Sequence, residues 1–183
     1  MNEKEIILNN IYNRKSVRSY TNDEISKEDL LKIIKAGMSA PSTCNFQPWQ
    51  FIIIQDSETL RDMGEIHKYS KMFKGAKAGI VVLGDINKTL EGNEEFWVQD
   101  CSAATENILL SANALGIGSV WTGIYPVEIR VKALKKYFKL PDNIYPLSLI
   151  ALGYPDTEVE VKDKWDETKV HWEKWWNIYF LVL

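Results

Sequence analysis

The amino-acid sequence predicts an α+β fold. Segments in which apolar residues recur at helical spacing alternate with short apolar runs that are typical of buried strands. The alternation lacks the regular strand–helix–strand rhythm of a parallel α/β sheet. The 183 residues contain no internal repeat, low-complexity run or Gly/Ser-rich linker, so we expect a single domain over residues 1–183.

Apolar periodicity and capping signals predict five helices. The first carries Ile6, Ile7 and Ile11 and ends near Arg14. The second begins at Ser26, with Asp29 as its capping partner, and Pro41 closes it. The others are expected from Ser57 through Met63 and as far as His67, over Glu94–Leu115, and from Pro126 to Tyr137. Residues expected to face the interior are Leu30, Leu31, Ile34, Met38, Leu60, Met63, Ala103, Ala104, Ile108, Leu115, Val131, Leu134 and Tyr137.

Four short runs are predicted to be strands. They are Phe51–Ile54, Ala78–Leu83, Gly118–Gly123 and Tyr145–Leu152. Gly116 and Gly118 are expected to end the long helix and turn the chain. The tail from Tyr154 onward is first charged, then aromatic, then apolar.

Composition narrows the classes of function. A formal net charge of −3 argues against a nucleic-acid-binding surface, although a local basic cluster can still bind a small anion. Only two cysteines, Cys44 and Cys101, favour a reducing, cytoplasmic setting over a disulfide framework. No Cys or His pair has metal-ligand spacing, and no apolar run is long enough to cross a membrane. The polar first residues do not resemble a signal peptide.

A basic cluster follows the first helix. Arg14 and Arg18 are four residues apart, and Lys15 and Ser16 lie between them. In an extended chain Arg14, Ser16 and Arg18 share one side, and on a helix the two arginines are neighbours. Two converging guanidinium groups suit a shared anion such as a phosphate monoester. A solvated basic turn is the alternative interpretation of this segment alone.

A second polar segment links the second helix to the first strand. The run Pro41-Ser-Thr-Cys-Asn-Phe-Gln-Pro-Trp49 is rich in amides and hydroxyls, and prolines fix the backbone near both ends. Amide side chains both donate and accept, so they match the rim of a heteroaromatic ring such as flavin. An ordinary polar loop is the alternative. Cys44 is expected to be a small packed side chain, not a reactive thiol.

These segments together resemble the nitroreductase family of FMN enzymes. Arg-Lys-Ser-x-Arg at 14–18, the Pro41–Trp49 run, Gly116-Ile-Gly-Ser-Val-Trp-Thr-Gly123 and Leu152-Gly-Tyr-Pro155 are similar to four family motifs in the same order. The resemblance implies a mixed, mostly antiparallel sheet flanked by helices. It also implies an intertwined homodimer with FMN at the subunit interface, onto which the tail of about 156–183 would pack.

The resemblance also implies roles for individual residues. Arg14, Lys15, Ser16 and Arg18 would hold the phosphate, the ribityl chain or the polar edge of the ring. Pro41, Ser42, Thr43, Asn45 and Gln47 would approach the flavin from the partner subunit, and Thr122 and Gly123 would lie along the isoalloxazine. Lys164 occupies a position where the family usually has a phosphate-binding arginine; a lysine offers a point charge and not a fork, and a solvated tail charge is the alternative.

The implied activity is hydride transfer from NADH or NADPH through FMN to a small electrophilic acceptor, such as a nitroaromatic or a quinone, by a ping-pong cycle. The flavin carries the chemistry, so no catalytic acid, base or metal is predicted.

Five apolar residues before or at the start of the long helix have two possible places. The core or the dimer interface is expected for them, and an aromatic wall over the flavin is the alternative; they are Tyr69, Met72, Phe73, Phe96 and Trp97. Glu106 stays open between a cofactor contact and a solvated or interface carboxylate. A reductive dehalogenase, a flavin-degrading oxygenase and a non-catalytic flavin-binding protein are the rival functions.

Overall fold

A computed structural model describes residues 2–175 of the chain. Its sheet has the order β1-β2-β4-β3, and every neighbouring pair is antiparallel. The strands are β1 (Trp49–Ile54), β2 (Ala78–Asp85), β3 (Gly118–Gly123) and β4 (Ile144–Gly153). The sequence-based prediction of an α+β fold with a mostly antiparallel sheet is therefore confirmed. The apolar end of the tail, Ile178–Leu183, which we expected to pack on a partner, lies outside the described residues.

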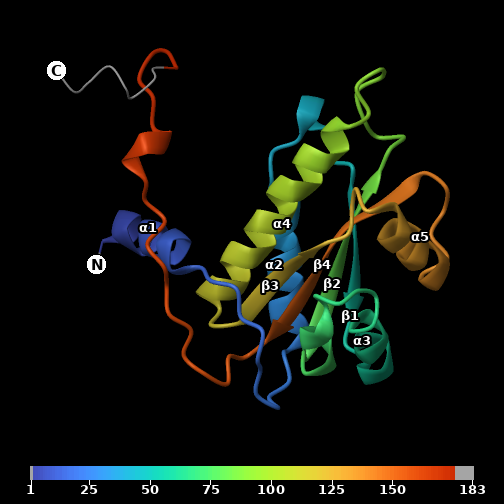
Figure 1. The fold of residues 1–183 in the computed structure, drawn as a ribbon, viewed down its shortest axis with the longest axis horizontal. Helices are drawn as coiled ribbons and strands as arrows, with labels where there is room; N and C mark the ends of the chain where they lie inside the picture. The colour runs from blue at the N-terminus through green and yellow to red at the C-terminus, as the bar shows by residue number, and fades with distance from the viewer. Residues whose placement is uncertain (1, 176–183) are drawn as a thin grey trace.

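Helices cover both faces of this sheet (Figure 1). One face packs on α2 (Lys27–Met38) and α4 (Phe96–Ala114), and the other on α3 (Ser57–Met63) and α5 (Glu128–Tyr137). Along β2 the buried side chains alternate, so that Ile80 and Val82 face α4 while Val81 and Leu83 face the α3–α5 side. Helices bury the side chains on both faces of the sheet. The strands are therefore continuous apolar runs although the sheet is antiparallel.

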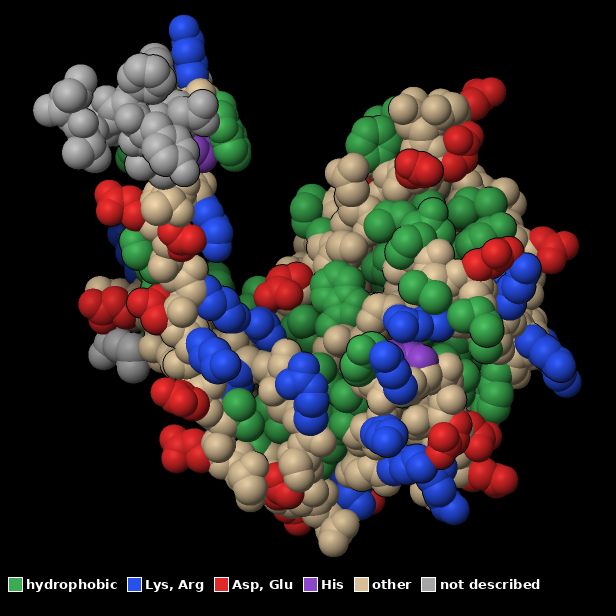
Figure 2. Space-filling model, in the orientation of Figure 1, with side chains coloured by type: hydrophobic (Ala, Val, Ile, Leu, Met, Phe, Trp, Pro, Cys, Tyr) green, Lys and Arg blue, Asp and Glu red, His purple; other side chains and the backbone are tan. Residues whose placement is uncertain are grey.

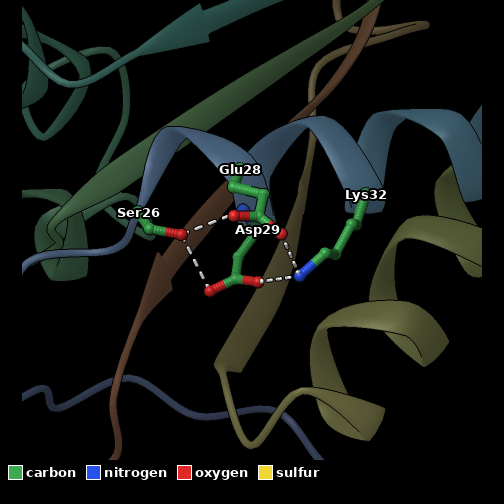
Figure 3. Close-up of polar contacts among 4 residues, drawn as sticks. All are labelled: Ser26, Glu28, Asp29 and Lys32. Atoms are coloured by element: carbon green, nitrogen blue, oxygen red, sulfur yellow. Dashed lines mark hydrogen bonds and ion pairs between the residues drawn. The ribbon is translucent and has the colours of Figure 1, made fainter.

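Helix α2 begins where the capping signal predicted. The Ser26 hydroxyl accepts the backbone N–H of Asp29 and donates to the Asp29 carboxylate, and Lys32 lies between Glu28 and Asp29 (Figure 3). The bond from Lys32, followed by the bond from Ser26, lowers the pKa of the Asp29 carboxyl. This cap fixes the helix entry, so that Leu30, Ile33, Ile34 and Gly37 face the core.

The N-terminal helix and the C-terminal segment extend away from the body of the molecule (Figure 1). Helix α1 (Glu3–Asn13) has no buried residue, and Ile6, Ile7 and Ile11 are exposed. The segment Val161–Trp165 lines a cavity with the last turn of α1, so the two ends of the described chain lie together. Trp165 and Trp172 on this segment are exposed as well. The two ends thus present an apolar surface to solvent.

Several details differ from the prediction. The cap of α3 is Asp56 and not Ser57, because the Asp56 carboxylate accepts the N–H of Thr59. Leu31 and Met38 point to solvent, and Ile33 takes their place in the core. Helices α4 and α5 each begin two residues later than expected. Leu115 and Tyr137 are also exposed, since they lie at or beyond the last helical turn.

Within residues 2–175 no helix has the length and apolarity that a membrane crossing requires. The same part of the chain holds no group of three His, Cys, Asp or Glu side chains arranged to bind a metal ion.

Candidate functional site

The basic segment after α1 runs along the edge of the sheet. Arg14 ends the helix with an extended backbone, and Ser16 then forms a parallel bridge with Ser119 of β3. Val17 is buried and donates its N–H to the Ser119 carbonyl at 2.9 Å. A Cβ at Gly118 would lie 2.8 Å from the Val17 side chain, so only glycine allows this approach. With Val17 turned inward, the extended chain directs Ser16 and Arg18 to the opposite side, as the spacing predicted.

Burial of Tyr20 holds the segment in place. Its hydroxyl donates to the Val17 carbonyl at 2.7 Å. Burial raises the pKa of the Tyr20 phenol, although nearby Arg18 acts against this effect, so the hydroxyl remains a donor.

A small pocket of about 280 Å³ brings together the predicted anion-binding residues. It is lined by Arg14, Lys15, Ser16, Arg18, Val159, Glu160, Val161, Lys162 and Lys164. The structure thus places Lys164 beside the first basic cluster, although more than 140 residues separate them in sequence. Five cations face one carboxylate, Glu160, so the pocket favours an anion.

Arg14 is oriented by the long helix. Its Nε lies 3.5 Å from Oε1 of Glu106 on α4, and its side chain is mostly buried. Glu106 pairs with Arg14 and is half exposed, so a cofactor contact and a solvated or interface carboxylate both stay predictions for it. This ion pair engages Nε, and the two terminal nitrogens of the guanidinium group stay available to a ligand.

A larger cavity of about 650 Å³ adjoins the small pocket, and Arg18 lines both. Thr122 and Gly123 at the end of β3 form part of its wall, together with Val120 and Trp121. The rest of the wall comes from His67–Tyr69, Lys71 and Met72, between α3 and β2, and from Arg130 on α5. The cavity is large enough for a planar ligand with a second molecule stacked on it.

The end of β3 offers backbone rather than side-chain groups to this cavity. Thr122 is buried, and its hydroxyl donates to the Leu149 carbonyl at 2.9 Å. Nothing lies within 4 Å of the place a Gly123 Cβ would take, so the backbone there is open to a ligand. Arg130 donates from Nη1 to the Gly123 carbonyl at 2.8 Å, which holds its guanidinium group beside the strand end.

His67 is the one imidazole in the cavity wall. Its Nδ1 accepts the backbone N–H of Tyr69 at 3.1 Å, so Nε2 carries the proton of the neutral ring. Burial, and to a smaller extent Arg130, lowers the pKa of His67, and the ring is therefore neutral at pH 7.

The loop from Pro41 to Gln47 lines neither pocket of its own chain. Thr43 donates from its N–H and hydroxyl to the buried Asp100 carboxylate at the start of α4. Ser42 accepts the N–H of Gln47, and the Gln47 amide donates to the Asn45 side chain. The loop is thus firmly held, while Pro41, Asn45 and Gln47 stay exposed to solvent.

Backbone strain is concentrated in the same loop. Cys44, Asn45 and Gln47 all have positive φ angles, of 47°, 58° and 50°. The Cys44 side chain is exposed, so the expectation of a packed side chain was wrong; the left-handed turn directs it outward. Strained, well-supported loops of this kind are typical of binding sites.

The five apolar residues considered for an acceptor wall lie in three environments. Phe73 and Trp97 are buried in the core, as expected. Tyr69 and Met72 line the large cavity beside Thr122 and Gly123, and Met72 also packs against the core. A place for these two residues at a dimer interface stays a prediction. Phe96 lines a separate cavity before α4.

A sequence-family comparison identifies the family. The family model described as "Nitroreductase family" matches residues 11–154, well over half of the chain. The chain belongs to the nitroreductase family. It is 48% identical over 174 residues to an Archaeoglobus fulgidus protein that has been assigned as an NADH dehydrogenase/NAD(P)H nitroreductase, covering 93% of this chain and 99% of that protein.

Solved structures of nitroreductase-family proteins share the fold. A Parabacteroides distasonis protein with the same assignment superposes with a TM-score of 0.87 at 41% identity, over 92% of this chain and 98% of that one. A nitroreductase of Desulfovibrio desulfuricans, solved in complex with FMN, gives a TM-score of 0.76 at 31% identity, over 90% and 94% of the two chains.

Proposed function

We propose that this nitroreductase-family protein is an FMN-dependent oxidoreductase that carries hydride from NADH or NADPH to a small electrophilic acceptor. One observation carries the proposal: two adjoining pockets share Arg18, one lined by cations and the other by the open backbone at the end of β3. A cationic pocket beside a larger cavity suits the phosphate and the ring of a mononucleotide. Family membership and the FMN complex of the D. desulfuricans relative support the same cofactor.

The donor set of the small pocket fits the FMN phosphate. The arginines supply planar forks, Lys15 and Lys164 add positive charge, and Ser16 adds a hydroxyl donor. A phosphate monoester carries roughly −1.5 to −2 charges near neutral pH, which offsets the mutual repulsion of these cations. The large cavity would then hold the ring, with the backbone of Thr122 and Gly123 as part of the wall around it.

When bound, FMN supplies the redox chemistry by accepting hydride from the nicotinamide and passing it to the acceptor in a ping-pong cycle. The protein orients the ring, excludes water and supplies positive charge. Arg18 and Arg130 lie on the cavity wall, where they would stabilise negative charge on the ring of the bound cofactor. The proposed mechanism assigns no catalytic acid or base to the chain.

We further propose that the working unit is a homodimer. Pro41, Ser42, Thr43, Asn45 and Gln47 form a rigid, polar loop outside the pockets of their own chain, as expected if they serve the partner's flavin. The exposed apolar side chains of α1 and of the C-terminal segment suit burial against a second copy. In this arrangement residues 1–183 form one domain, with the tail of about 156–183 on the partner. Unpaired Cys44 and Cys101 fit a cytoplasmic setting.

The visible absorbance spectrum of the purified protein tests this function. We expect a yellow protein that NADH or NADPH bleaches under anaerobic conditions, and whose colour returns when a quinone or nitroarene is added. A colourless protein that takes up no FMN when the cofactor is supplied in excess would exclude the proposal. A protein that binds FMN but oxidises neither donor would instead be a non-catalytic flavin-binding protein.

A further inference from the structure

Polar contacts hold the end of helix α1 on α4. Asn10 donates from Nδ2 to the Leu110 carbonyl at 3.0 Å, and Asn113 donates to the Asn10 side chain at 2.8 Å. One turn further along the chain, Arg14 pairs with Glu106 at 3.5 Å. Residues 106, 110 and 113 are spaced by four and three, so they form one stripe on α4. This stripe therefore sets where the end of α1 lies beside α4 (Figure 1).

Glu106 lies behind the anion pocket and not in it. It lines neither the small pocket nor the large cavity. Its carboxylate reaches Nε of Arg14, whereas the two terminal nitrogens of a guanidinium group form the fork that suits phosphate oxygens. Among the ion pairs of residues 2–175, this pair alone involves a cation of the small pocket. The only contact between Glu106 and the pocket thus runs through Arg14.

The other cations of the small pocket repel the Arg14 guanidinium group. Lys15, Arg18, Lys162 and Lys164 line the same pocket, and Figure 2 shows Lys and Arg side chains where the two chain ends meet the body of the molecule. Helix α1 has no buried residue, so apolar packing of the helix does not hold Arg14 against this repulsion. A fixed carboxylate on the Nε side does. Arg14 is therefore oriented before any ligand arrives.

We propose that Glu106 is a positioning residue that holds Arg14 in the orientation that binds the flavin phosphate. In this role it sets the preference of the site for FMN over riboflavin. The inference rests on the proposed function and adds a residue to its phosphate site. The negative charge of Glu106 also repels a phosphate, but the guanidinium group lies between the two anions, and water screens the repulsion because Glu106 is half exposed. Positioning is thus the larger effect.

FMN and riboflavin provide the test, because they differ only in the phosphate group. In fluorescence titrations of the apoprotein, Glu106→Ala should raise the Kd for FMN about fivefold and leave the Kd for riboflavin unchanged, since a partly exposed ion pair contributes modestly. A carboxylate that only repelled the phosphate would give the opposite sign, with tighter binding of FMN to the variant. The matched control is Glu128→Ala, which removes a helix carboxylate paired with Lys132 outside both pockets. The control should keep both wild-type Kd values.

A double-mutant cycle shows whether Glu106 acts through Arg14. When Arg14 is already replaced by alanine, Glu106→Ala should no longer change the Kd for FMN, because the guanidinium group that it holds is gone. Glu106→Gln keeps an oxygen that can accept from Nε, so it should recover part of the affinity that Glu106→Ala loses. A purely structural role for Glu106 would instead weaken the binding of FMN and riboflavin alike.

Three results would overturn the proposal. They are an unchanged or lower Kd for FMN in Glu106→Ala, an equal rise for FMN and riboflavin, and an effect of Glu106→Ala that persists without Arg14. Each of them leaves the oxidoreductase function intact, because that function is read from flavin bleaching by NADH or NADPH in the wild-type protein. Wild-type protein that takes up no FMN would overturn the proposed function, and this inference with it.

Discussion

At the scale of single residues, Arg18 has the most informative position. It follows buried Val17 in the extended segment and lines both the anion pocket and the ring cavity. A ligand that spans the two pockets must pass it. Its neighbour Arg14 is already engaged by Glu106, whereas Arg18 makes no ion pair within the described residues. Among the cations that line these two pockets, only Arg18 lines both. Its loss should therefore weaken contacts to the phosphate and to the ring of the cofactor.

We expect Arg18→Ala to weaken FMN binding by about 2 kcal/mol, or roughly thirtyfold in Kd, because a charge-assisted hydrogen bond contributes about 1.5–3 kcal/mol. Fluorescence titration of the apoprotein with FMN measures this change. Arg18→Lys should recover part of the affinity, since it keeps the charge but not the fork. Arg61→Ala, on exposed α3, is the control. Equal affinity of the Arg18→Ala variant and the wild type would remove Arg18 from the site.

Because the Cys101 thiol is buried, we expect the free energy of unfolding to fall at alkaline pH. Burial, with a smaller effect of Asp100, raises its pKa to about 12 from the ordinary 9.0. A raised pKa in the folded state means that stability is complete below pH 9 and is lost as pH rises toward 12. The loss from this group should approach about 1.4 kcal/mol per pH unit within that window.

Denaturant unfolding between about pH 8 and 11 tests this limit. Cys101→Ala should flatten the alkaline fall in the free energy of unfolding. Cys44→Ala should not, because that side chain is exposed. If the slopes of the Cys101→Ala variant and the wild type are the same, the thiol does not titrate with unfolding.

At the scale of elements, the sequence predicts the type and order of all four strands and five main helices. The apolar runs are continuous because both faces of the sheet are covered, so each run was recognisable without its partner. The inner face of α2 was harder to predict. Leu31 and Met38 are as apolar as Ile33, and helical spacing alone does not say which apolar residue meets the sheet.

The candidate site also contains residues that the sequence predicted and residues that it did not. Arg14–Arg18 and Thr122–Gly123 were predictable because family motifs mark them, and the structure gathers them in adjoining pockets. Lys68, Lys71 and Arg130 were not predicted. Lysines and arginines on short surface segments are common, and only the fold shows that these three face the end of β3.

Close packing between β2 and α4 gives a prediction at this scale. A Cβ on Gly84 would overlap the Trp97 ring, which is buried in the core. Gly84→Ala should therefore lower the free energy of unfolding by about 1–3 kcal/mol through overpacking. Gly75→Ala is the control, since its Cβ would meet only one atom, at 4.0 Å. Chemical denaturation measures both variants, and equal losses would show that Trp97 moves aside without cost.

At the scale of the whole molecule, the body and the two chain ends have different characters. The body buries both faces of its sheet, whereas α1 buries none of its residues. Exposed isoleucines on one helix, and tryptophans on the segment beside it, are costly in water unless another surface covers them. This asymmetry is the main structural argument for the proposed homodimer.

Light scattering coupled to size exclusion should give twice the chain mass of 21.1 kDa. We expect Ile7→Glu/Ile11→Glu to shift the protein to monomers and to reduce its FMN content, because charges would replace apolar contacts and the partner's loop would be lost. The control Ile129→Glu, at an exposed position on α5, should remain dimeric and yellow. Monomeric wild-type protein that holds FMN fully would contradict this assembly.

The bridge between Ser16 and Ser119 affects how readily the protein aggregates. The strand β3 lies at one border of the sheet, and the segment that shields its backbone groups is the same one that would grip a phosphate. One segment therefore serves both the anion pocket and the border of the sheet. A substitution that detaches this segment from β3 should expose an unpaired edge strand and promote aggregation.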